Sequence, residues 1–162
     1  MKKFLVILAA CAALLSCSKE NSSGSKATYL PMIVISYSQN SAIQQGLSMT
    51  LKVDGRTICT FNKAEDNLSE ALSAGTSGTV TFECKCNDLT YTEATDLSLS
   101  LDVKAASYKG GAYGSHYPIV SDNFNAKALA ADKVGEYLTK KAGLLSCTYK
   151  YVVDADGKVT VE

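Results

Sequence analysis

LSLSLDV, at residues 97–103, is the stretch that decides the fold. Leucine and valine occupy its odd-numbered positions, whereas serine and aspartate occupy the even-numbered ones. A period of two is that of a β-strand, in which successive side chains point to opposite faces of the sheet. The stretch therefore predicts a strand with buried odd-numbered residues and water-facing even-numbered ones, as in an antiparallel sheet.

The same alternation recurs along the chain, and turn residues separate several of these stretches. Asp54-Gly55 and the segment 154–157 are typical hairpin turns. Residues 30–37 are apolar almost throughout, which indicates a strand covered on both faces. Together these patterns predict a mainly β fold, a two-sheet antiparallel, immunoglobulin-like β-sandwich of about seven strands with one helix. The seven stretches are 30–37, 47–53, 57–62, 80–86, 97–103, 145–153 and 158–161.

The helix is predicted near 125–142, where apolar residues fall close to helical spacing and Gly143 would end the helix. An immunoglobulin-style strand corner over 132–138, faintly similar to the Asp-x-Gly-x-Tyr pattern of those domains, is the alternative. A shorter helical turn is predicted over 62–72, because Asn62 and Glu65 have the spacing of a capping box.

The N-terminus has the order of a bacterial secretion signal. Lys2 and Lys3 carry positive charge, and an uncharged apolar run follows over 4–15. This run is too short to span a bilayer as a helix, which takes about 20 residues. The sequence before Cys17 resembles the lipobox of bacterial lipoproteins, and the whole N-terminus resembles that of Bacteroidota-type lipoproteins. The resemblance implies that Cys17 is lipidated; lipidation at Cys11, or cleavage without lipid, is the alternative.

This resemblance divides the chain into three parts and predicts its location. Residues 1–16 are the signal peptide, 17–27 are the lipidated cysteine and a small polar tether, and 28–162 form a single domain. Two or more acyl chains anchor a protein stably. Ser18 follows Cys17 in place of the aspartate that retains many such lipoproteins in the inner membrane, so the resemblance implies the outer membrane, with neither face favoured. Loss of the signal removes two of 16 basic side chains and no acidic one, which leaves a formal charge of −2. That charge argues against a nucleic-acid partner.

Four cysteines remain in the domain, an even number that favours disulfides in an exported protein. Cys84 and Cys86 lie two apart on one strand, so their side chains run parallel and do not pair with each other. The two pairings left open are Cys59–Cys84 with Cys86–Cys147, and Cys59–Cys86 with Cys84–Cys147. A thiolate metal carrier, with Cys84 and Cys86 as two of four ligands, is the alternative.

The segment 107–118, SYKGGAYGSHYP, is the candidate binding site. It holds Tyr108, Tyr113, His116 and Tyr117 among several glycines. Tyrosine offers a rigid apolar ring with a polar tip, which suits contact with proteins and with the faces of sugars. We interpret the segment as a long loop between the preceding strand and the helix.

No catalytic motif stands out, and we predict neither an enzyme nor a cofactor nor a bound metal. A triad of Ser115, His116 and Asp122 has no support, because adjacency in sequence gives no useful geometry. The expected function is a small non-catalytic binding or accessory domain for a protein or glycan at the cell envelope. A structural or assembly subunit of an envelope complex is the first alternative, and a small enzyme or metal carrier is the second. The sequence does not indicate an oligomeric state.

Overall fold

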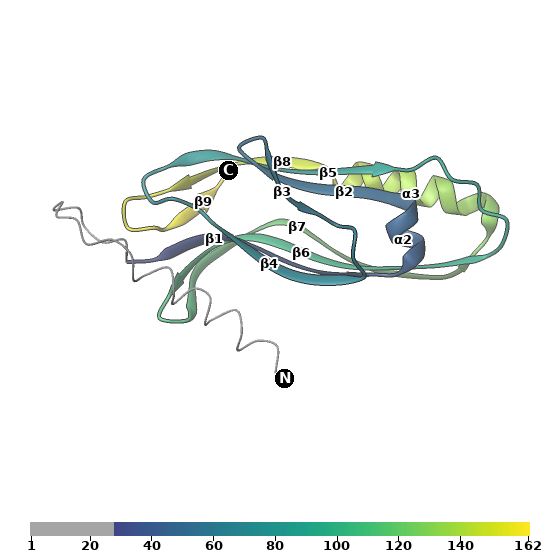
Figure 1. Cartoon of the computed structure of the whole chain (residues 1–162), viewed down its shortest axis with the longest axis horizontal. Helices are drawn as coiled ribbons and strands as arrows, with labels where there is room; N and C mark the ends of the chain where they lie inside the picture. Colours follow the sequence, from purple (N-terminus) through teal and green to yellow (C-terminus); the bar gives the residue numbers. More distant parts are fainter. Residues whose placement is uncertain (1–27) are drawn as a thin grey trace.

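The structure, a computed structural model, describes residues 28–162, which form two β-sheets packed face to face (Figure 1). Neighbouring strands are antiparallel in both sheets. The predicted class, a mainly β sandwich of two antiparallel sheets, is confirmed. The predicted signal peptide, the tether and the candidate lipidation residue Cys17 lie outside the described residues.

The first sheet consists of β1 (Leu30–Gln39), β4 (Glu65–Ala71), β6 (Thr95–Lys109) and β7 (Ala112–Leu129). Its order is β4-β1-β6-β7, so β1 and β6 are central. The strands β6 and β7 form a long hairpin joined by Gly110 and Gly111, which have φ of 60° and 84°. A two-residue hairpin turn of this kind needs positive φ at both positions, which glycine adopts without strain.

The second sheet consists of β2 (Leu47–Val53), β3 (Arg56–Thr60), β5 (Ser77–Cys86), β8 (Cys147–Val153) and β9 (Val159–Val161). Its order is β3-β2-β5-β8-β9. The two predicted hairpin turns, Asp54-Gly55 and 154–157, are both confirmed, since they join β2 to β3 and β8 to β9.

The core lies between the sheets and is built from inward-facing side chains. Along β6 the odd-numbered residues of 97–103 are at most 2% exposed, as their alternation predicts. Three aromatic rings contact one another in succession, with centroids 4.7 Å apart for Tyr37 and Phe61 and 5.3 Å apart for Phe61 and Phe82. A fully buried side chain such as Phe82 contributes about 2–3 kcal/mol by leaving water.

The predicted helix exists as α3 (Ala131–Leu145), which packs against β5 beside the second sheet (Figure 1). It begins later than predicted, because residues up to Leu129 still pair with β6 as the end of β7. The strand corner over 132–138 is therefore wrong. The helix runs through Gly143, and the Ser146 hydroxyl that follows it donates to the carbonyl of Ala142 at 3.0 Å. Its buried residues recur at helical spacing: Val134, Leu138, Ala142 and Leu145.

The second predicted helical turn, over 62–72, is wrong. Most of this segment is β4, in which Glu65 pairs with Ser38 of β1 instead of capping a helix. A short helix that the sequence analysis does not predict, α2 (Ser41–Gly46), lies between β1 and β2. The side chain of Asn40 caps it by accepting a hydrogen bond from the Ile43 amide at 3.2 Å.

The described residues form nine strands rather than about seven, and the two additional strands, β4 and β7, are the edges of the first sheet. Alternation is weak at an edge because inward-facing residues stay partly exposed there. Leu68 of β4 is opposite the buried Ile35 and is itself 37% exposed. The segment 107–118 is consequently not a long loop: it is the turn of the β6–β7 hairpin with the adjoining parts of both strands.

Candidate functional site

The candidate binding residues lie mainly on the outer face of the first sheet, the face that points away from the second sheet. Alternation along β6 puts its even-numbered residues on this face, and the residues opposite them on β7 share it. Asp102 is opposite Ser121, and Lys104 is opposite Pro118.

Two irregularities in β7 decide which of its side chains reach the outer face. The register shifts between Ser107 and Tyr108, where Gly114 is the extra residue, and between Val103 and Lys104. Such bulges turn residues that are three apart toward the same face. An added Cβ on Gly114 would lie 2.5 Å from the ring of Tyr29, so a larger residue at this bulge would have to displace that ring.

Because of the first bulge, Tyr108, Tyr113 and His116 form one group, called here the aromatic cluster. Ring centroids are 4.5 Å apart between Tyr108 and Tyr113, and 5.6 Å apart between Tyr113 and His116. The Lys104 ammonium lies 5.3 Å from the centre of the Tyr113 ring, within range of a cation–π interaction. These contacts hold the Tyr113 ring in place from several sides. The side chain is nevertheless 48% exposed, so the ring is still open to a ligand.

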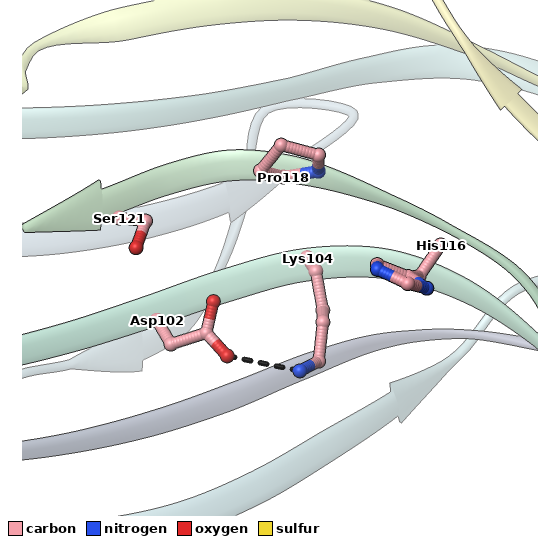
Figure 2. A pocket seen from close by; sticks show the side chains of 5 residues that line it. All are labelled: Asp102, Lys104, His116, Pro118 and Ser121. Atoms are coloured by element: carbon pink, nitrogen blue, oxygen red, sulfur yellow. Dashed lines mark hydrogen bonds and ion pairs between the residues drawn. The ribbon is translucent and has the colours of Figure 1, made fainter.

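Next to the aromatic cluster is a shallow depression of about 270 Å³, called here the polar hollow (Figure 2). Lys104 lies between Asp102 and His116, and its ammonium forms an ion pair with the Asp102 carboxylate at 2.9 Å. The hydrogen bond to this carboxylate raises the pKa of Lys104, so its ammonium stays charged at neutral pH. The hollow is lined by Asp102, Lys104, His116, Pro118 and Ser121.

The fourth predicted binding residue, Tyr117, does not join this group. It is opposite Ala105, an odd-numbered and fully buried residue of β6, so it belongs to the inner face of the sheet. The structure thus brings together three of the four predicted residues. It adds Asp102, which the alternation of 97–103 already placed on the solvent face, and also Lys104 and Ser121, which lie outside that stretch.

Residues 115, 116 and 122 do not form a catalytic triad. Ser115 is opposite Ser107 on the inner side and its hydroxyl lies 3.3 Å from the Ser107 hydroxyl, whereas His116 is on the outer face. Asp122 forms an ion pair with Lys141 of α3 at 2.8 Å. Adjacent residues of a strand point to opposite faces, which separates Ser115 from His116.

The four cysteines of the domain are free thiols in the structure, so the predicted disulfides are not formed. Each of the four cysteines is opposite an inward-facing residue of a neighbouring strand, so all four thiols are on the inner face of the second sheet. The distances between them are nevertheless too large for a disulfide. Cys59 of β3 and Cys84 of β5 are separated by β2, hence by about 9–10 Å. Cys147 is opposite Phe82, two residues along from Cys84 and about 8 Å away. A disulfide needs Cα atoms within about 7 Å.

These thiols also do not assemble into a metal site. No group of three or more histidine, cysteine, aspartate or glutamate side chains in residues 28–162 has the geometry to hold a metal ion. Burial raises the pKa of Cys59 to about 11 and that of Cys84 to about 12, so neither is a thiolate at neutral pH. Cys86 is half-buried and lines a second shallow hollow between α3 and the loop before β6.

The exposed edges of the sheets are protected against pairing with another strand. Edge strand β7 carries Pro118 and the inward-facing charge of Asp122, and edge strand β4 carries three acidic residues. Bulges, proline and inward charges all discourage strand addition. At the edges of the second sheet, β3 and β9 have only five and three residues. These edges give no support to the alternative of an assembly subunit that adds strands.

No known protein family, no curated protein and no solved structure matches the chain. Neither α2 nor α3, the helices of the described part of the chain, is long and apolar enough to cross a membrane. The case for a function therefore depends on the aromatic cluster, the polar hollow and the lipobox resemblance.

Proposed function

We propose that the protein is a lipid-anchored, non-catalytic binding module of the bacterial outer membrane, and that it recognises a protein or glycan of the cell envelope. In this proposal Cys17 carries the lipid. The aromatic cluster and the polar hollow together form the recognition surface, which we call the binding face.

The observation that carries the proposal is the exposure of Tyr113 within a preorganised group. Its ring is 48% exposed, yet it contacts Tyr108, His116 and Lys104. A tyrosine fixed in this way loses little conformational freedom when it binds, which favours its use as an anchor. A structural role alone would favour a buried ring.

The character of the hollow supports binding rather than catalysis. It is shallow, whereas enzyme sites are clefts that enclose most of a ligand and exclude water. Its one carboxylate, Asp102, is already paired with Lys104.

The position of the tether fits a partner in the envelope. Leu30, near the start of the described chain, is opposite Tyr108 of the aromatic cluster. Thirteen residue steps lead from Cys17 to Leu30, and a chain of that length spans at most about 47 Å when fully extended. A lipid on Cys17 would thus hold the binding face within that distance of the membrane surface.

The test is site-specific photocrosslinking in intact envelopes. The full chain is produced with the photoreactive residue p-benzoylphenylalanine in place of Tyr113, and in a control chain in place of Val152. Val152 is 43% exposed on β8 of the other sheet, and so is a matched exposed position off the binding face. We expect an adduct from position 113 and not from position 152. Equal adducts at both positions, or none at position 113, would refute the proposal.

A further inference from the structure

We propose that the ligand of the binding face is a neutral oligosaccharide, one ring of which stacks on Tyr113 while its hydroxyl groups bond to the polar hollow. This inference rests on the proposed function and narrows it to one class of ligand. It follows from the chemistry of the two adjoining parts of the face.

The first part is an aromatic platform. The Tyr113 ring is supported by Tyr108 at 4.5 Å between centroids and flanked by His116 at 5.6 Å. Sugars present a face of C–H groups that packs on an exposed aromatic ring, and a ring already fixed by its neighbours needs no reorganisation to accept it.

The second part supplies matched hydrogen-bonding groups beside that platform. Asp102 only accepts hydrogen bonds, Lys104 only donates them, and the Ser121 hydroxyl does both. Neighbouring hydroxyl groups of a sugar each donate and accept, so they match such a pair of side chains. Asp102 remains 44% and Lys104 22% exposed, so both can still reach a ligand from within their ion pair.

The charge of the hollow selects a neutral ligand. Asp102 and Lys104 lie 2.9 Å apart and cancel each other, and the remaining lining residues are His116, Pro118 and Ser121. A phosphate or carboxylate ligand would need a surplus of arginine or lysine, as in known anion sites. The lining of this hollow provides no such surplus.

The size of the hollow selects a short segment of glycan rather than a protein surface. Its volume is about 270 Å³. That lies just below the range of about 300–1,000 Å³ for small-molecule pockets, and it suits one or two sugar rings of a longer chain. Protein interfaces instead bury about 800 Å² on each partner around apolar anchors. Apart from Tyr113 and Leu30, the large exposed apolar residues lie elsewhere.

The chain provides its own reporter for the test, because His116 is its only histidine. The imidazole C–H signals in a proton NMR spectrum are therefore unique and come from the binding face itself. The full-length protein in detergent micelles is titrated with neutral trisaccharides of glucose, N-acetylglucosamine, mannose and galactose, and with trigalacturonate as a charged counterpart. Concentrations up to about 10 mM detect even a Kd near 1 mM.

We expect at least one neutral trisaccharide to shift the His116 signals in a saturable way, and trigalacturonate to bind more weakly. Tyr113→Ala should weaken the binding of that trisaccharide about tenfold or more, whereas Tyr113→Phe keeps the ring and should stay within about threefold. Val152→Ala on the other sheet should leave the binding unchanged. A melting curve of each variant shows that it is folded.

The inference is overturned if no neutral trisaccharide shifts the signals, if trigalacturonate binds more tightly, or if Tyr113→Ala binds as the parent does. Failure of the inference and failure of the proposed function remain distinguishable. A protein adduct at position 113 in envelopes, with no sugar response, would retain the binding face and replace the glycan with a protein partner.

Discussion

Replacing Tyr151 with phenylalanine tests how the second sheet is stabilised at its turn end. Tyr151 is 4% exposed, and its hydroxyl donates a hydrogen bond of 2.7 Å to the carboxylate of Asp54. The other oxygen of that carboxylate accepts from the Thr79 amide at 2.8 Å, so Asp54 links three strands. Burial, together with the negative charge of Asp54, raises the pKa of Tyr151 from 10.0 to about 12.

The expected effect on stability follows from this pKa. A group whose pKa is higher in the folded than in the unfolded protein contributes its full stabilisation at a pH below its pKa in the unfolded protein. That contribution is lost as the pH rises through its pKa in the folded protein. For Tyr151 the window runs from about pH 10 to pH 12. The loss is about 1.4 kcal/mol at pH 11 and approaches about 2.7 kcal/mol above pH 12. At neutral pH Tyr151→Phe costs about 1.5 kcal/mol for the lost hydrogen bond to a charged group.

The assay is urea unfolding followed by circular dichroism at pH 8, 10 and 11, for the parent and for Tyr151→Phe, in the presence of a reductant. The buried thiols of Cys59 and Cys84 also weaken the fold at high pH, but they do so equally in both proteins and cancel in the difference. We expect the stability gap to narrow by about 1.4 kcal/mol between pH 8 and pH 11. A gap that is constant over this range would refute the reasoning.

Three further predictions concern other parts of the chain. Under native conditions Cys86 should react with iodoacetamide well before Cys84, because Cys84 is only 6% exposed and burial raises its pKa to about 12. Peptide mapping by mass spectrometry would measure the two rates, and equal rates would contradict the prediction. Gly143→Ala should raise the stability by about 0.5–1 kcal/mol, because a Cβ at this position of α3 meets no other atom within 4 Å, whereas Gly157→Ala should lower it, because Gly157 has φ of +85° and a Cβ there would lie 2.2 Å from the carbonyl oxygen of Tyr29. Melting curves of the two variants would check this, and a lower melting temperature for Gly143→Ala than for Gly157→Ala would refute it. Cys17→Ser should abolish acyl labelling and release the chain from the membrane fraction, and labelling that persists would show that another residue is lipidated.

The sequence predicts the central strands from their complete burial, and it predicts the short edge strands β3 and β9 from the hairpin turns that precede them. The central strand β6 alternates strictly, since its odd-numbered residues face a closed core. The edge strands β4 and β7 were beyond this reasoning for physical causes. In β4 an inward residue such as Leu68 stays partly exposed. In β7 the bulge between Pro118 and Val120 switches the inward-facing residues from odd-numbered to even-numbered positions.

The same two causes explain the outcome for the candidate site. Composition alone pointed to the tyrosines of 107–118, and the bulge at Gly114 then put Tyr113 and His116 on the outer face while Tyr117 fell on the inner one. For the cysteines, alternation correctly placed Cys84 and Cys86 on one face. Their distances from the other thiols depend on which strands are neighbours, and that order is not encoded in any local pattern.

The two-glycine turn of the β6–β7 hairpin also has a consequence for the order in which the chain folds. It joins strands of 15 and 18 residues through a turn of two residues, so this hairpin closes with a small loss of chain entropy. Hairpins form in about 1–10 μs, whereas non-local pairings such as that of β1 with β6 take milliseconds to seconds in β-sandwiches. We therefore expect the hairpin to form the early nucleus onto which β1 docks, with the binding face assembled on it before the rest of the sandwich closes.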